Sequence, residues 1–204
     1  MLDLKTIFIE NPQALKFNES EALRYLRLRT LDCETRTLFD ECTRLIYESS
    51  SPKAVYGRTN IEVSNGVVDF EFFKVNSDKL SLCLKDCKEA YIFAATLGIS
   101  VDRLIEKYSK ISQSKAAVCD AIASALIEGF CDHVNKNLSH EKVTVPRFSP
   151  GYGDFDLKHQ RDILSLLDAN RKIGITLTET NFMLPTKTVT AIIGIKEGKG
   201  NNER

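Results

Sequence analysis

The sequence lacks an excess of charge, and it lacks long apolar runs. Its 204 residues contain 28 Lys and Arg and 28 Asp and Glu, so the formal net charge is zero. Broad adhesion to nucleic acid or anionic lipid needs an excess of Lys and Arg, so we expect neither partner. No apolar run approaches the roughly 20 residues that cross a bilayer, so we expect no membrane span.

The N-terminus lacks the basic and apolar segments of an export signal, so we expect a cytoplasmic protein. Its six cysteines are then expected to stay reduced and to pack as small apolar side chains. Cys83 and Cys87 are one helical turn apart, but no CxxC pair and no His at ligand spacing accompanies them. This pattern favours a packed thiol face over a metal site.

Length and composition predict a single globular domain over residues 1–196, followed by a disordered tail at 197–204. Residues 1–50 are expected to be mostly helical after a short extended segment at 7–9, with Ser20 as a helix N-cap. Five arginines at positions 24–44 raise the alternative of a nucleic-acid surface. Interleaved Asp and Glu residues favour a solvated helical face instead.

The remaining chain alternates between extended and helical patterns. Asn65-Gly66 lies between two β-favouring runs and predicts a tight hairpin, because both residues tolerate positive φ. Further strands are predicted at 89–96, 143–145, 175–178 and 188–195. Helices are predicted near 80–87, after Ser100 as an N-cap, at 114–138, and from 156 to a close at Gly174. The fold class is therefore α+β, with a mostly antiparallel sheet and packed helices.

The helix predicted at 114–138 is the most regular feature of the sequence. Apolar residues recur every four positions along one side. A neighbouring stripe of small residues, including Ala121 and Ala125, allows another backbone or a ligand to approach closely. Glu128 is the long charged residue on this stripe. Spacing alone leaves it open whether Glu128 is an exposed surface carboxylate or a ligand contact.

The best candidate site is the irregular loop at 147–154. Its glycines at 151 and 153 permit close backbone approach to a ligand. Arg147 offers a planar fork for a carboxylate, and Tyr152 offers a stacking face and a hydroxyl. Glu141 lies upstream across a short predicted strand. Such a set suits a small zwitterionic or cationic ligand, and an ordinary loop with a surface arginine is the alternative.

These residues carry a family resemblance. The motif Arg147-x-x-x-Gly151-Tyr152 resembles the S-adenosylmethionine site in the activation domain of cobalamin-dependent methionine synthase. The family's acidic residue six positions before the arginine is matched by Glu141, and a carboxylate in a Glu-x-Phe context is matched by Glu128. The similarity is closest over 114–195. It includes downstream residues at matching spacing, namely Leu166, Leu167, Ile173, Gly174, Leu177, Thr178 and Glu179.

The resemblance implies roles for particular residues. Arg147 would pair with the ligand's carboxylate, and Glu128 and Glu141 would lie near its positive sulfonium. Tyr152 would face the corrinoid where the methyl group is transferred. The implied binding set is Glu128, Glu141, Arg147, Ser149, Gly151 and Tyr152. No general base is required for this chemistry, so His133, His140 and His159 are expected to be incidental.

The resemblance also implies a function. In the family, S-adenosylmethionine and an electron from flavodoxin or a similar donor restore methylcobalamin from inactive cob(II)alamin. The chain has no room for the cobalamin-binding module and stops just after Ile195, short of the family's C-terminal extension. We therefore expect the activation component of a methyltransferase that acts on a separate corrinoid protein in methionine biosynthesis. The alternative is a non-enzymatic docking module for a corrinoid protein that no longer binds S-adenosylmethionine.

Overall fold

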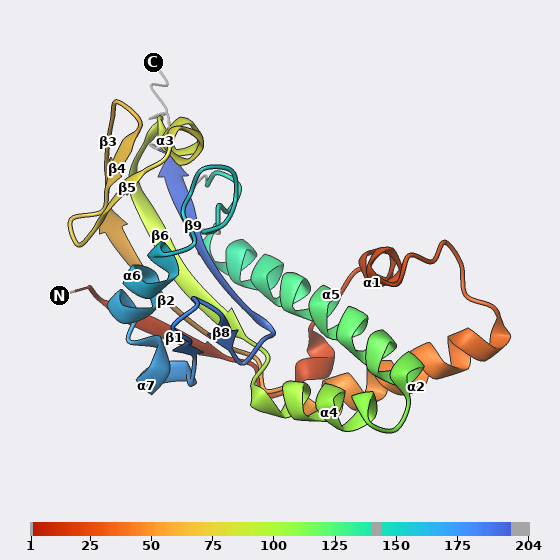
Figure 1. Ribbon diagram of the computed structural model, residues 1–204. Helices are drawn as coiled ribbons and strands as arrows, with labels where there is room; N and C mark the ends of the chain where they lie inside the picture. Colours follow the sequence, from red (N-terminus) through yellow and green to blue (C-terminus); the bar gives the residue numbers. More distant parts are fainter. Residues whose placement is uncertain (1, 140–143, 197–204) are drawn as a thin grey trace, which may run out of the picture.

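The computed structural model describes residues 2–139 and 144–196, and its centre is a four-stranded sheet (Figure 1). All neighbouring strands in this sheet are antiparallel, which confirms the predicted α+β class. The strand order is β1-β2-β6-β9, so β9 lies at an edge. The strands are β1 Leu4–Phe8, β2 Lys53–Asn60, β6 Cys87–Thr96 and β9 Thr188–Lys196.

Two smaller sheets flank the central one. The predicted hairpin is present, since Asn65 and Gly66 have φ of 49° and 79° between β3 and β4. The short strands are β3 Glu62–Ser64, β4 Val67–Asp69 and β5 Lys74–Asn76 in one sheet, and β7 Thr176–Leu177 and β8 Met183–Leu184 in the other.

The longest helix covers one face of the central sheet together with other helices. Phe93 and Ile193 project from the strands into the same buried cluster as Phe130, which lies on α5. In Figure 1, α5 runs beside β9, and α2 and α4 pack against its far end. The elements of this layer are η1 Pro12–Ala14, α1 Glu19–Leu26, α2 Cys33–Ser49, α4 Ile99–Ser109 and α5 Gln113–Leu138.

The opposite face of the sheet has its own core. Ile92 and Ile192 alternate with the residues of the first face, as the period of two in a strand requires, and they pack with Phe70 and Ile163. The helices of this layer are α3 Asp78–Leu84, α6 His159–Leu166 and α7 Ala169–Ile173. Gly174 has φ of 76° and ends α7, as predicted.

Several predicted boundaries were wrong by a few residues. Asn18, not Ser20, is the N-cap of α1, because its side-chain oxygen accepts a hydrogen bond from the Ser20 amide. Gly98, not Ser100, precedes α4, and α3 begins at Asp78 because Ser77 caps it. The strand predicted at 143–145 is reduced to an isolated bridge between Thr144 and Ile195 in its described part. Residues 143 and 197–204 lie outside the described chain.

The cysteines and N-terminal arginines have ordinary environments. All six cysteines are free thiols, and four of them are buried. Within 2–139 and 144–196, no cluster of His, Cys, Asp and Glu could hold a metal ion. Arg24, Arg36 and Arg44 form ion pairs with carboxylates on α1 and α2. None of the helices in the described ranges combines the length and apolar content that a bilayer crossing needs.

Candidate functional site

The loop at 147–155 runs along the outer edge of β9. Phe148 exchanges two backbone hydrogen bonds with Ile192, at 2.9 Å and 2.8 Å between nitrogen and oxygen. The Val145 amide also donates to the Gly194 carbonyl at 2.9 Å. These bonds fix the start of the loop against the sheet, with α5 on its other side. The loop therefore has a rigid platform although it contains no regular structure.

The turn at the tip of the loop depends on glycine. Gly151 has φ of 93°, a conformation that side chains with a Cβ rarely adopt. Its amide donates to the Phe155 carbonyl at 2.7 Å, and the Tyr152 amide donates to the Ser149 carbonyl at 3.1 Å. Phe155 is almost fully buried beneath the turn. The backbone at 149–152 is therefore bent, and Gly151 and Tyr152 at its tip are exposed whereas Pro150 is buried.

Asp154 fastens the end of this turn to α3. Its carboxylate accepts hydrogen bonds from the Ser77 hydroxyl at 2.5 Å and from the Asp78 amide at 2.8 Å. The Ser77 hydrogen bond is the main cause that lowers the pKa of Asp154, and the amides at the start of α3 add to it. The loop is thus held at one end by β9 and at the other by a helix N-terminus.

Arg147 bridges two carboxylates on α5. Its Nη1 donates to Asp132 at 2.5 Å, and its Nη2 donates to Glu128. Glu128 and Asp132 are one helical turn apart, so a single guanidinium reaches both. Burial lowers the pKa of Arg147, but the Asp132 hydrogen bond and the neighbouring carboxylate charges outweigh it and raise that pKa. Arg147 is therefore a permanent cation between two carboxylates.

A wall of three residues separates two cavities. It consists of Glu128, Arg147 and Tyr152, which line both cavities. The smaller cavity, of about 240 Å³, lies over the turn and the start of β9. The larger one, of about 460 Å³, lies between α1 and α5. A ligand with two dissimilar ends has room on either side of the arginine.

The structure brings together five of the six residues predicted for the site. Glu128, Arg147, Ser149, Gly151 and Tyr152 all line the smaller cavity. The sixth, Glu141, lies outside the described residues, as does His140. One difference concerns charge: the family resemblance assigns Arg147 and Glu128 to different ends of a ligand, whereas here they pair with each other.

Sequence reasoning missed Asp132. It follows Glu128 by four residues on the same helix, and this spacing was the available signal. His159 does not face the cavity as a reactive group. It is mostly buried, its Nδ1 lies 2.7 Å from Asp162, and its ring packs 5.6 Å from Phe155. His159 supports the turn from beneath, and His133 lies beside Asn137 on α5.

The chemistry of the site is that of binding and orientation. Two carboxylates share one guanidinium, so Glu128 stays available for a cationic group of a ligand whose anionic group binds Arg147. Tyr152 has 60% of its surface exposed, and its ring makes an edge-on contact with Phe148 at 6.3 Å. Much of the tyrosine ring is therefore open for stacking.

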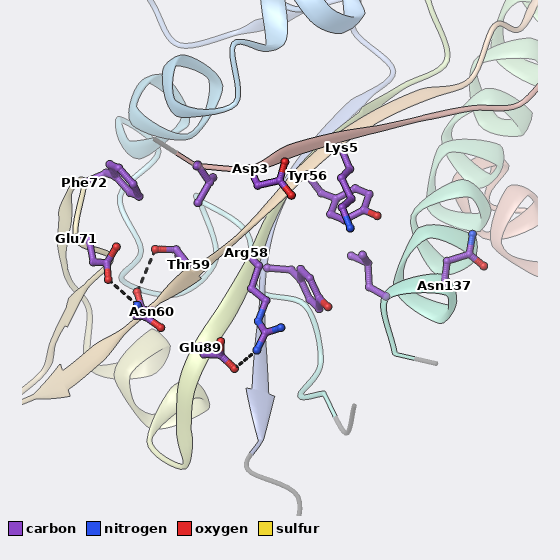
Figure 2. Close-up of a pocket in the computed structure, with 13 residues that line it drawn as sticks. Asp3, Lys5, Tyr56, Arg58, Thr59, Asn60, Glu71, Phe72, Glu89 and Asn137 are labelled. Carbon is purple, nitrogen blue, oxygen red and sulfur yellow. Dashed lines mark hydrogen bonds and ion pairs between the residues drawn. The ribbon is translucent and has the colours of Figure 1, made fainter. Parts of the chain in front are cut away.

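A third cavity, of about 590 Å³, lies at the opposite end of β6 (Figure 2). Its polar groups pair with one another across the strands. Arg58 donates to Glu89 at 2.5 Å, and Asn60 donates to Glu71 at 2.8 Å. None of the described residues predicted for the site lines it. Because none of those residues lies there, this cavity is a weaker candidate than the Arg147 site.

Comparison with known proteins identifies the family. The model of the vitamin B12-dependent methionine synthase activation domain matches residues 75–198, which is more than half of the chain. The chain belongs to this family. The match includes α5, the Arg147 loop and β9, so the resemblance stated from the sequence is confirmed.

A solved structure extends the likeness to nearly the whole fold. It is described as the crystal structure of the MetH reactivation domain bound to AdoHcy, and it superposes with a TM-score of 0.67 at 17% sequence identity. The match covers 95% of this chain and 78% of that one. The activation-domain fold is therefore present here, including the N-terminal helices that lie before the matched family region. A search of curated proteins gave no match.

Proposed function

We propose that this protein binds S-adenosylmethionine at the Arg147 loop and supports reductive methylation of a cob(II)alamin held by a separate corrinoid protein. Family membership supports the reactivation role. The observation that carries the ligand assignment is the guanidinium of Arg147 between Glu128 and Asp132, beside a glycine turn and two cavities. The related solved domain holds AdoHcy, the product of methyl transfer from this ligand.

Charge complementarity supports the choice of ligand. S-adenosylmethionine carries a carboxylate, an ammonium and a sulfonium, so it is a net cation. Its carboxylate would take the hydrogen-bonding edge of Arg147 that Asp132 occupies, and Glu128 would lie near the sulfonium or the ammonium. We retain Glu141 as a further carboxylate of the site on the basis of the family motif. Ser149 and Gly151 would contribute backbone groups of the bent turn.

The proposed role of the residues is to position the methyl group. The reduced corrinoid of the partner would supply the nucleophile, with the electron coming from a flavodoxin-like donor. The methyl group would form a bond to that nucleophile as the methyl–sulfur bond breaks, and the electron pair of the broken bond would stay on sulfur and leave the neutral thioether. Tyr152, which is exposed at the rim, would pack against the corrinoid face and exclude water there. Holding the methyl group close to the acceptor is the whole contribution required of this chain. We expect the activity in the cytoplasm, because all six cysteines are unpaired.

Calorimetry with S-adenosylmethionine tests the binding step. Arg147→Ala should weaken binding by about 1.5–3 kcal/mol, the value of a hydrogen bond to a charged group. Arg44→Ala is the matched control, because Arg44 forms an ordinary exposed pair with Glu48 on α2. Unchanged affinity in Arg147→Ala, or an equal loss in both variants, would refute the assigned site.

The visible spectrum of a cob(II)alamin protein tests the reactivation step. Mixing it with this protein, S-adenosylmethionine and a reductant should convert the spectrum to that of methylcobalamin. Capture of a cobalamin protein with no detectable ligand binding would instead favour the docking module. The exposed side chains of Tyr152 and Phe182, at 60% and 70%, are the observation that keeps this second function in view.

A further inference from the structure

The smaller cavity contains an unusual pair of hydrogen-bonding groups. Three buried side-chain oxygens in the described chain have no hydrogen-bond partner: Asn135 Oδ1, Gln160 Oε1 and Thr190 Oγ1. Gln160 and Thr190 both line the cavity beside Arg147, whereas Asn135 lies elsewhere on α5. A buried polar atom without a partner costs about 1–3 kcal/mol, so two of them at one cavity require an explanation.

These two residues are firmly placed. Gln160 is 7% exposed on the first turn of α6, and Thr190 is 2% exposed on β9. Neither is a surface side chain that adopts many conformations. Gln160 lies on α6 and Thr190 shares a strand face with Ile192, so both belong to the largely apolar layer that contains Phe155 and Ile163. The polar character of this pair is therefore more consistent with recognition of a ligand than with stability.

The adjacent strand edge adds backbone groups to the same cavity. Ile192 directs its amide and carbonyl outward, to Phe148. Because the direction of these groups alternates along a strand, the amide and carbonyl of Thr190 also point to the outer edge of β9. Among the described residues, no backbone partner reaches Thr190 from that side. The cavity is thus bordered by donors and acceptors from both a side-chain amide and a strand edge.

We propose that Gln160 and Thr190 recognise the base of the adenosyl ligand and make the site specific for adenine. This assignment rests on the proposed function and adds the residues that select the ligand. A glutamine amide presents an acceptor beside a donor, which matches the amino group and neighbouring ring nitrogen of adenine. The base would enter the 240 Å³ cavity, and the amino-acid part would extend past Arg147 into the 460 Å³ cavity.

The test compares two ligands that differ only in the base. S-adenosylhomocysteine carries adenine, and S-inosylhomocysteine has a carbonyl in place of its amino group. The wild-type protein should bind the adenosyl compound about tenfold more tightly or better, the range of a good bidentate amide–base pair. Gln160→Leu should lose that preference, because it should weaken binding of the adenosyl compound and leave binding of the inosyl compound unchanged. Thr190→Val, which keeps the shape of the side chain, should weaken binding of the adenosyl compound severalfold.

Thermal unfolding without ligand separates recognition from a structural role. Replacing an unpartnered buried oxygen by carbon should leave the melting temperature unchanged or raised in Gln160→Leu and Thr190→Val. Asn135→Leu is the matched control, since it removes the third unpartnered oxygen and should leave both dissociation constants unchanged. If Gln160→Leu does not fold, Thr190→Val and the two ligands still decide the question.

The outcomes distinguish this inference from the proposed function. Failure of the wild-type protein to bind S-adenosylmethionine or either homocysteine compound would refute the proposed function. Binding that depends on Arg147 but is equal for the two bases, or a preference that survives in Gln160→Leu, would overturn the base assignment alone. In that case the two oxygens are simply buried without a partner, and the cavity does not select the base.

Discussion

The Arg147 guanidinium donates to Asp132 across 2.5 Å, although the two residues are fifteen positions apart and on different elements. Glu128 accepts from the other Nη group, so both Nη groups of the guanidinium have carboxylate partners. The two carboxylates differ in exposure: the side chain of Asp132 is 73% exposed and that of Glu128 is 40% exposed. An incoming ligand carboxylate must replace one of them, and the exposed one is the easier to release.

Asp132→Asn should therefore tighten S-adenosylmethionine binding. Removing the competing carboxylate leaves one edge of Arg147 open, and an exposed pair of this kind is worth up to about 1 kcal/mol, or roughly fivefold in affinity. Calorimetry at low salt measures the change. Glu106→Gln removes the same charge from a remote pair with Lys110 and serves as the control. Weaker binding in Asp132→Asn would mean that Asp132 itself contacts the ligand.

Gly129 lies where α5 meets the N-terminal segment. A Cβ at this position would come within 2.3 Å of the Lys16 carbonyl oxygen, which is a backbone atom that cannot move freely. Gly129→Ala should lower the free energy of unfolding by about 1–3 kcal/mol through overpacking. Urea unfolding measures it. In an unobstructed helix the same substitution raises stability by roughly 0.5–1 kcal/mol, so an increase would show that the contact is absent.

Much of the site was predictable because its parts are close in sequence or on one periodic helix. The loop at 147–152 is marked by its glycines, and Glu128 by its place on the small-residue stripe of α5. Both patterns report local backbone geometry, which the sequence determines directly. The same reasoning predicted the Asn65-Gly66 hairpin and the closure of α7 at Gly174.

The site residues that the sequence did not predict are brought together by contacts between distant segments. Asp132 is bonded to Arg147 only because β9 holds the loop against α5. Gln160 and Thr190 border one cavity although α6 and β9 are separated by α7 and a hairpin. No local pattern in the sequence records such a meeting, since register and packing are set by the whole core. The predicted N-caps were wrong for smaller reasons: Asn18 and Ser20 could both cap α1, and α4 begins after Gly98, which has no side chain to mark the cap.

The acid stability of the protein should depend on Asp154. Its pKa is held below the ordinary value, so its stabilising effect is complete above about pH 4 and is lost as the pH falls through the lower folded value. Asp154→Asn should have a lower melting temperature than the wild type at neutral pH, and the two should converge on acidification. Calorimetric melts from neutral to acidic pH measure the difference. A constant difference would mean that the Ser77 hydrogen bond does not need the charge.

The thiols should differ sharply in reactivity. Cys33 is exposed at the first residue of α2, whereas Cys83 is half-buried and burial raises its pKa. Burial likewise raises the pKa of Cys131, which lies behind Arg147. A maleimide at neutral pH should therefore modify Cys33 first, and Cys33→Ser should remove the fast phase. Fast labelling of Cys131 in the folded protein would contradict the packing of α5 against the sheet.

Alanine substitutions at two glycines with positive φ distinguish an effect on backbone strain from an effect on ligand binding. Gly151 has φ of 93° in the candidate site, and Gly174 has φ of 76° at the end of α7 with open space around it. Alanine at either position should lower the free energy of unfolding by about 1–2 kcal/mol, because a Cβ disfavours this conformation. Gly151→Ala should also weaken S-adenosylmethionine binding, since the bent backbone lines the cavity, while Gly174→Ala should bind normally. Equal affinities, with both variants folded, would show that the turn at Gly151 shapes the loop without contacting the ligand.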